Sequence, residues 1–173
     1  MPNVLLQLLG GAKPHALRRW INLWPPFLGA GIRVKHIAPD MKAVEVEMKL
    51  RWWNANYVGT HFGGSLYSMT DPFFMLMLID NLGPEYLVWD KAATIRFKKP
   101  GRGKVRAEFR LSDEQIDEIR RAAAANGKTE PTFVVQVKDE TGEVVAEVEK
   151  VLWVKRKTGA ALTSAPASSP PLA

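Results

Sequence analysis

The sequence predicts an α+β domain in which about six largely antiparallel strands surround one apolar helix. The first observation is the strict alternation of apolar and charged residues in AVEVEMKLRW (43–52), which is typical of a half-buried strand. The second is the apolar run FFMLMLI (73–79), which is hydrophobic all round and too short to span a bilayer. Because one sheet face cannot cover such a helix alone, we expect the sheet to curl around it and a second subunit to cover its other side.

One helix and one hairpin are predicted ahead of the apolar run. Residues 15–24 place four apolar side chains at helical spacing, and Pro25 and Pro26 are expected to end that helix. GIRVKHIA (31–38) precedes the alternating strand 43–52 across the turn PDMK, so the two strands are predicted to pair as a hairpin.

Two further strands and a polar helix are predicted after the apolar run. KAATIRFKK (91–99) and KVRAEFRL (104–111) alternate again and are separated by PGRG. Residues 112–127 are predicted as a helix that begins with a capping box from Ser112 to Gln115 and ends at a glycine.

The chain is expected to form one domain over residues 1–157. TFVVQVKD (132–139) and EVVAEVEKVLWV (143–154) are predicted to form a last hairpin, and a phase slip near 147–151 indicates a bulge. The Ala/Ser/Pro-rich segment 158–173 can bury little apolar surface, so we expect it to be disordered.

Composition favours a globular protein of a reducing compartment, and the cytoplasm is the expected location. The 173 residues are 46% hydrophobic and 24% charged, and none is cysteine, which excludes a disulfide framework and a thiolate zinc site. The opening MPNVLLQLLGG lacks the basic segment and the length of a signal peptide. The histidines show no ligand spacing, so no metal site is expected.

The net charge of +6 favours polyanionic partners. Basic residues cluster at 97–104 and 150–157. Nucleic acid, anionic lipid and a nucleotide-bearing substrate such as coenzyme A are all compatible with such a field, and so is an ordinary solvated basic face. Because no nucleic-acid-binding motif accompanies the charge, a nucleic-acid partner is not expected.

A glycine pair and a nearby acid are the candidate reactive groups. Gly63 and Gly64 lie where the chain is predicted to enter the helix, and their N–H groups could polarise a carbonyl oxygen, although the pair could also serve only as a tight turn. Asp71 follows Gly64 by seven residues, so the two share a helix face about 10 Å apart. Two such helices packed antiparallel around a twofold axis would bring one subunit's Asp71 to its partner's glycines.

Pro72 offers a different interpretation of Asp71. A proline at this position should kink the helix, and Asp71 could then cap a second helical segment with Pro72 at its first position. Against a cap, the carboxylate would lie among apolar neighbours such as Met69 and Phe73, an environment typical of working acids.

The segment NYVGTHFGG (56–64) with the acid at position 71 resembles the hotdog-fold acyl-CoA thioesterases of the PaaI-like group, and more closely their relatives in the DUF4442 family. Asn56, Gly59, Gly63, Gly64 and Asp71 match the family pattern in register. The segment LWPPFLGAGIRV is also similar to DUF4442 sequences, and the resemblance covers about residues 15–155.

The resemblance implies a hotdog fold, with an antiparallel sheet wrapped around a central helix at about 64–82, and a homodimer or a tetramer. The implied activity is hydrolysis of an acyl-CoA-type thioester, with coenzyme A entering only as part of the substrate and no other cofactor. Asp71 would act as general base or nucleophile, Gly63 and Gly64 would hold the carbonyl oxygen, and Asn56 would orient water or the thioester.

Further substrate contacts are expected from side chains of two kinds. The cations proposed to meet the phosphates of coenzyme A are Arg96, Lys98, Lys99 and Arg102. The apolar side chains proposed to line an acyl tunnel are Phe62, Tyr67 and Phe74.

His61 departs from the family pattern. The family histidine position holds Phe62, and His61 comes one residue early, which turns its side chain by roughly 100° on a helix. The family role is therefore not assigned to His61, for which a loop-stabilising role and a substrate contact remain equal alternatives.

Two rival functions remain open. A hotdog dehydratase or hydratase would use a histidine with an acid across the dimer, which His61 and Asp71 could imitate. A non-catalytic acyl-chain or acyl-CoA binder would explain the replacement of the family histidine by Phe62.

Overall fold

One antiparallel sheet of seven strands forms the frame of the molecule. The computed structural model describes residues 14–157, so the predicted disordered segment 158–173 and the first part of the predicted domain lie outside the described residues. The strand order is β1-β2-β4-β6-β7-β3, and β5 pairs with β7 beside this path. The strands are β1 (Ile32–Ile37), β2 (Ala43–Lys49), β3 (Tyr86–Phe97), β4 (Lys104–Arg110), β5 (Lys128–Thr129), β6 (Thr132–Asp139) and β7 (Val144–Arg156).

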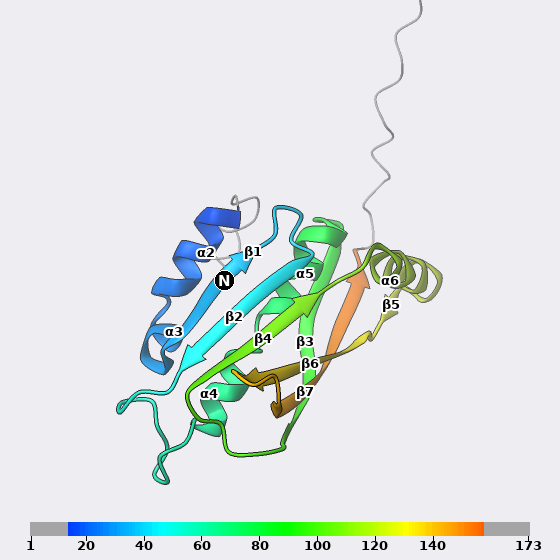
Figure 1. Cartoon of the computed structure of the whole chain (residues 1–173). Coiled ribbons are helices and arrows are strands. Elements are labelled where there is room, and N and C mark those ends of the chain that lie inside the picture. The colour runs from blue at the N-terminus through cyan, green and yellow to red at the C-terminus, as the bar shows by residue number, and fades with distance from the viewer. Residues whose placement is uncertain (1–13, 158–173) are drawn as a thin grey trace, which may run out of the picture.

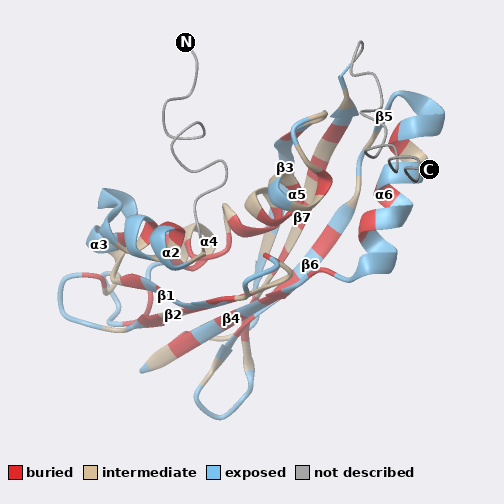
Figure 2. Ribbon diagram, turned by 90° about the horizontal axis from the view of Figure 1, so that it is seen from above, coloured by how far each residue is buried: buried red, intermediate tan, exposed pale blue. Residues whose placement is uncertain are grey.

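Five helices of the described part of the chain pack along the sheet. They are α2 (Pro14–Leu23), α3 (Pro25–Ala30), α4 (Gly63–Ser68), α5 (Phe73–Leu82) and α6 (Asp113–Asn126). Helices α4 and α5 lie between α2 and α3, which flank β1, and α6, which packs at the opposite end beside β5 (Figures 1 and 2). The predicted single central helix and surrounding antiparallel sheet are confirmed in outline.

Helix α5 supplies the centre of the core. Its side chains Phe73, Phe74, Met77, Leu78 and Leu82 are buried, and each contributes about 1.5–3 kcal/mol by leaving water. The inward faces of the strands meet them, as the alternating buried and exposed positions of the sheet show (Figure 2). The expectation of a buried helix at 73–79 is therefore correct.

The predicted helix 64–82 is interrupted. The segments α4 and α5 are separated by the turn at 69–72, where the amides of Thr70 and Asp71 bond to carbonyls three residues back. Proline has no N–H to continue the helical ladder, so the kink expected at Pro72 is present. Pro72 is itself the N-cap residue of α5, and no side chain caps this helix. The alternative that Asp71 is a helix cap is therefore wrong.

Several predicted boundaries move in the structure. Pro25 and Pro26 end α2 at Leu23 but also open the short helix α3, because proline suits the first helical position. The alternation of strand 43–52 stops at Lys49, and Trp52 is 88% exposed. The capping box from Ser112 to Gln115 is present as predicted.

The buried positions of the last strand, β7, explain the apparent phase slip in its sequence. The core-facing positions of β7 continue without a slip through Ala146, Val148, Lys150, Leu152 and Val154, all of which are buried. The predicted bulge at 147–151 is wrong, because the apparent slip is a lysine in a core position. The pairing irregularities lie elsewhere, at Val145 against β6 and between Asp90 and Ala92 of β3 against β7.

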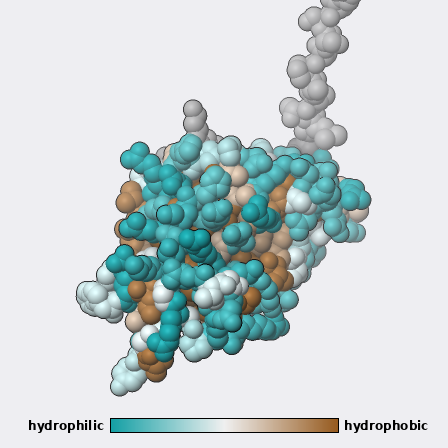
Figure 3. All heavy atoms as spheres, viewed as in Figure 1, coloured by the Kyte–Doolittle hydropathy of each residue, from teal (hydrophilic) through white to brown (hydrophobic). Residues whose placement is uncertain are grey.

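The outer face of the sheet is mostly hydrophilic. Apolar atoms are visible in Figure 3 where β4 and β6 diverge. Only three residue pairs join these two strands, and a half-open cavity of about 810 Å³ lies there, with Phe74 and Val134 among its lining residues.

Candidate active site

Asp71 lies in the turn between α4 and α5, where its carboxylate is anchored but partly open. The Tyr67 hydroxyl donates a hydrogen bond to Asp71 Oδ1 at 2.9 Å. The Lys150 ammonium donates to the same oxygen at 2.9 Å, and also to the main-chain carbonyl of Asp71 at 2.9 Å. The Asp71 side chain is 44% exposed. The predicted apolar surroundings are thus corrected, because Met69 and Phe73 turn into the core while the carboxylate meets charged and polar groups.

Lys150 is the buried centre of the site. It is fully inaccessible to solvent, and its Nζ lies 3.0 Å from Asp90 Oδ1 as well as against Asp71. The Tyr67 ring lies 5.5 Å from the ammonium, within cation–π range. Burial lowers the pKa of Lys150, but the hydrogen bonds and charges of Asp71 and Asp90 outweigh burial and raise it above its ordinary value. Lys150 is therefore a cation at neutral pH.

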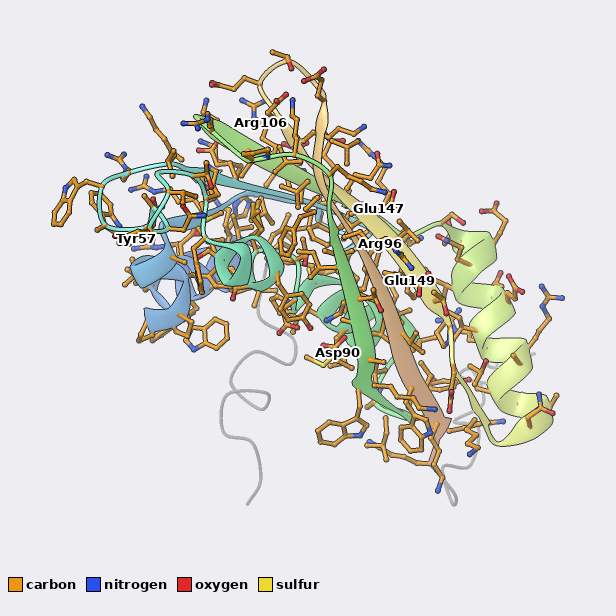
Figure 4. All side chains as sticks on the ribbon, turned by 90° about the horizontal axis from the view of Figure 1, so that it is seen from below. Tyr57, Asp90, Arg96, Arg106, Glu147 and Glu149 are labelled. Atoms are coloured by element: carbon orange, nitrogen blue, oxygen red, sulfur yellow. The ribbon has the colours of Figure 1, made fainter. Side chains whose placement is uncertain are left out.

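A bulge in β3 aims Asp90 at this ammonium. Asp90 pairs with Leu152 and Ala93 pairs with Lys150, so the register shift between Asp90 and Ala92 puts both on the same face of the sheet as Lys150. Ala93 is exposed, and Asp90 contacts the ammonium with 26% of its side chain exposed. Figure 4 shows Asp90 on β3. Burial raises the pKa of Asp90, and the Lys150 charge opposes this shift.

Tyr67, which the sequence predicts to line an acyl tunnel, is bonded to the candidate acid. Its hydroxyl is committed to the Asp71 carboxylate. Burial raises the pKa of Tyr67, and the bond to Asp71 raises it further, so the phenol remains a proton donor at neutral pH. The four-residue spacing of Tyr67 and Asp71, one helical turn, brings the two side chains together.

Gly63 and Gly64 open α4, as predicted. A side chain at Gly63 would meet the Phe97 ring at 2.9 Å, and one at Gly64 would meet the Phe62 ring at 2.5 Å. The N-cap residue Phe62 makes no side-chain cap, so the first N–H groups of α4 receive no side-chain acceptor there. Gly63 lines a cavity of about 440 Å³, whose other lining residues include Asn56, His61, Phe97, Lys98 and Lys99. Asp71 does not line this cavity.

His61 is buried, with 3% of its surface exposed. Its Nε2–H donates to the Gly103 carbonyl at 3.1 Å, while Nδ1 has no hydrogen-bond partner among the described residues. Burial lowers the pKa of His61, and the bond to Gly103 opposes this only in part, so the ring is neutral. Its contact with Gly103 supports the loop-stabilising alternative.

Asn56 organises the loop ahead of α4. Its Oδ1 accepts from the backbone N–H groups of Val58 and Thr60, and its Nδ2 donates to the Thr60 hydroxyl and the His61 carbonyl. Both polar ends of the amide are thus occupied within the loop. In this arrangement Asn56 positions the loop, where the sequence had suggested direct contact with water or thioester. Tyr57, at the loop tip, is fully exposed (Figure 4).

The two phenylalanines predicted to line an acyl tunnel differ in environment. Phe62 is 56% exposed and covers Gly64. Phe74 is 3% exposed and packs against Phe109 and Phe133, with ring centroids 5.2 and 4.5 Å away. Phe74 is a core residue that also reaches the cavity between β4 and β6.

The structure separates the four predicted phosphate-binding cations. Lys98 and Lys99 border the cavity next to Gly63, but Lys99 is paired with Asp139 at 2.5 Å and with Glu143. Arg96 projects beside Glu147 across β3 and β7 (Figure 4). Arg102 is exposed in the loop before β4. Lys98 and Arg102 are the cations best placed to meet an anion.

Sequence reasoning missed Lys150 and Asp90. A signal for Lys150 was present, because position 150 continues the apolar alternation of Ala146, Val148, Leu152 and Val154. A charged residue in such a phase must find buried partners or distort the strand. Asp90 gave no comparable signal, since its orientation depends on the bulge.

A curled antiparallel sheet around a broken central helix defines the hotdog-fold class. The family model of a domain of unknown function, DUF4442, matches residues 15–154, and the chain belongs to that family. No curated protein matches the sequence. Among residues 14–157, no helix combines the length and apolar character needed to cross a membrane.

Solved structures support the same class. The Pseudomonas aeruginosa protein PA5026, named a protein of unknown function and probable thioesterase, is 27% identical over 91% of this chain and 97% of its own, with a TM-score of 0.65. The phenylacetic acid degradation protein PaaI from Thermus thermophilus is 24% identical over 75% of this chain and 98% of its own, with a TM-score of 0.52. The thioesterase HI1161 from Haemophilus influenzae shares 14% identity over 83% of this chain and 91% of its own, with a TM-score of 0.60.

Proposed function

We propose that this protein hydrolyses acyl thioesters of the coenzyme A type, with Asp71 as the reactive carboxylate. The observation that carries the proposal is the anchored, half-open carboxylate of Asp71 at the helix break, held by Tyr67 and a buried ammonium. A carboxylate with one side fixed and the other open suits proton abstraction from water. The likeness to PA5026, named a probable thioesterase, adds support for the reaction class.

The reaction needs no group beyond water and the chain's own side chains. Asp71 accepts a proton from water as the water oxygen bonds to the thioester carbon, and the carbonyl oxygen becomes an oxyanion that accepts from the Gly63 N–H. When the oxyanion collapses, the carbon–sulfur bond breaks and the leaving sulfur takes the proton from Asp71. The products are a carboxylic acid and a thiol. Direct attack by the Asp71 carboxylate on the thioester is the alternative first step.

The site is proposed to need two subunits. Gly63 faces the cavity beside Phe97, whereas Asp71 faces Lys150 on β7. Within residues 14–157, strand β3 ends the sheet and pairs only with β7, so its other edge has no strand partner there. A second chain on this edge would bring its own glycine pair toward Asp71, since a twofold axis exchanges the two elements. The oligomer is thus proposed to be a homodimer or a tetramer of such dimers.

The dehydratase alternative needs His61 to work with an acid of the partner chain. His61 is 3% exposed and its Nε2–H is bonded to the Gly103 carbonyl, which disfavours such a role. The experiment that tests hydrolysis also tests the alternative that the protein binds acyl groups without catalysis.

The direct test is turnover of a panel of short- and long-chain acyl-CoA thioesters, followed by release of free thiol. Asp71→Asn should lower kcat by about 10²–10⁴-fold, because the amide cannot accept the proton, while light scattering still shows a dimer. Glu118→Gln, an exposed carboxylate-to-amide change on α6, is the matched control. Turnover of Asp71→Asn within about twofold of the unmodified protein would contradict the assignment, and binding without turnover by the unmodified protein would favour the binder.

A further inference from the structure

The ammonium of Lys150 is an unusual occupant of the core. Lys150 follows Val148 and precedes Leu152 on the inward face of β7, and none of its surface reaches solvent. Burying a charge costs several kcal/mol unless partners compensate it. Here the compensation comes from two carboxylates that lie far apart in the sequence, Asp71 from the helix break and Asp90 from the β3 bulge.

The two oxygens of the Asp71 carboxylate are not equivalent. Oδ1 accepts from both Tyr67 and Lys150. Oδ2 accepts no hydrogen bond from any residue in the range 14–157. The side chain is nevertheless 44% exposed, so Oδ2 is the oxygen left open.

Asp90 is the second carboxylate at this anchor. It lies 3.0 Å from Lys150 Nζ, and its side chain is 26% exposed. Two carboxylates share one ammonium, so Asp90 both orients the cation and competes with Asp71 for its charge. The titratable side chains brought to Asp71 are Tyr67 from α4 and Lys150 from β7, with Asp90 from β3 across the ammonium.

We infer that Lys150 and Asp90 are positioning residues for the proposed hydrolysis: Lys150 fixes Oδ1 of Asp71 so that Oδ2 is presented to the attacking water, and Asp90 holds Lys150 in place. The inference rests on the proposed function of Asp71. It assigns the reacting oxygen and adds two residues from strands that the glycine motif does not include.

The inference predicts a lower kcat at unchanged KM for two substitutions. Lys150→Met removes the group that fixes Oδ1, so kcat should fall about 10²-fold at neutral pH because the carboxylate loses its orientation. Asp90→Asn removes one of the two carboxylates that hold Lys150, so kcat should fall by a smaller factor, about 3–10-fold. KM should change little in both variants, since neither side chain is proposed to touch the substrate.

Controls separate this role from simple destabilisation. Lys155→Met removes an exposed lysine of the same strand and should leave kcat and KM unchanged. Circular dichroism and thermal unfolding check that each variant is folded. If Lys150→Met fails to fold, Asp90→Asn alone still tests the inference, because a purely structural Asp90 would leave the kcat of the folded variant unchanged.

A second readout does not depend on turnover. The carboxyl ¹³C shift of Asp71, measured in the full chain by NMR at neutral pH, should change in Lys150→Met and in Asp90→Asn and stay in place in Lys155→Met. Absence of turnover in the unmodified protein would refute the proposed function, while a changed Asp71 shift in both variants would still support the positioning role of the two residues. An Asp71 shift that is unchanged in both variants would overturn the inference.

Discussion

A single buried cation holds the candidate site together at the scale of residues. Lys150 binds Asp71 and Asp90, and Tyr67 adds a neutral donor to Asp71. The ammonium is fully buried, whereas the side chains of Asp71 and Asp90 are 44% and 26% exposed. Removing the ammonium would leave both acids uncompensated, which is more costly than losing an exposed ion pair of the same kind.

His61 gives a prediction about stability and pH. Because burial lowers its pKa in the folded chain, the unfolded chain binds the proton more readily. The folded state therefore has its full stability above about pH 6.5, the ordinary histidine value, and loses stability as the pH falls below it. His61→Gln should reduce this loss in urea unfolding measured between pH 5 and 8.

The exposed His36 on β1 provides the control. His36→Gln should retain the acid-side loss of stability at the same protein concentration. An unaltered pH slope in His61→Gln would show that His61 is not the group that titrates.

The predictability of the site from sequence varied among its residues. Spacing and the family resemblance predict Asp71, Gly63 and Gly64 as site residues. The structure puts Asp71 in a polar cluster and the glycines at the start of a helix. Lys150 was not predicted as a site residue, because a lysine in a strand is usually solvated. Only its position in the buried phase of the strand indicated that it is buried. Asp90 depended on long-range pairing, which no local pattern encodes.

At the scale of elements, the break between α4 and α5 is the feature that positions Asp71. It places Asp71 outside both helices, at the end of α4 and against β7. A continuous helix would hold Asp71 in a different direction relative to Lys150, since each residue turns the helix by about 100°. Pro72 thus helps to set the direction of the neighbouring Asp71 side chain.

The start of α4 allows a test of the proposed Gly63 N–H donor. Gly63→Pro deletes the N–H at the first helical position, where proline is tolerated, and Phe62 already has the extended conformation that precedes proline (φ −65°, ψ 127°). Loss of this donor should lower kcat by about 10²–10³-fold in the thiol-release assay.

Gly63→Ala is the matched control for that substitution. It adds the same Cβ against the Phe97 ring, at 2.9 Å, but keeps the N–H. Its kcat should therefore be well above that of Gly63→Pro. Equal activity of the two variants would argue against a role for this donor.

Element boundaries were predictable where local chemistry decides them. The capping box of α6 and the alternation of β2 and β4 follow from neighbouring residues. The early start of β3 at Tyr86 was missed, because residues 86–90 pair with β7 through contacts far along the chain. The two-residue strand β5 was missed for the same reason.

At the scale of the whole molecule, strand β3 is the exposed edge strand to which we propose that a partner subunit binds. It is twelve residues long and carries exposed Leu87, Trp89 and Phe97. Among the strands of the described part of the chain, it pairs with β7 alone. Long unprotected edges are rare in proteins that remain monomeric. A second subunit on this edge would cover these side chains and complete the proposed site.

The most direct test of this central claim is a heterodimer made from one Asp71→Asn chain and one Gly63→Pro chain, purified through two different tags and assayed with an acyl-CoA thioester. A site shared across the twofold axis leaves one of the two sites in that heterodimer intact, so about half of the unmodified activity should return although each parent homodimer is inactive. A heterodimer as inactive as its parents, or an unmodified protein that is a monomer, would contradict a shared site.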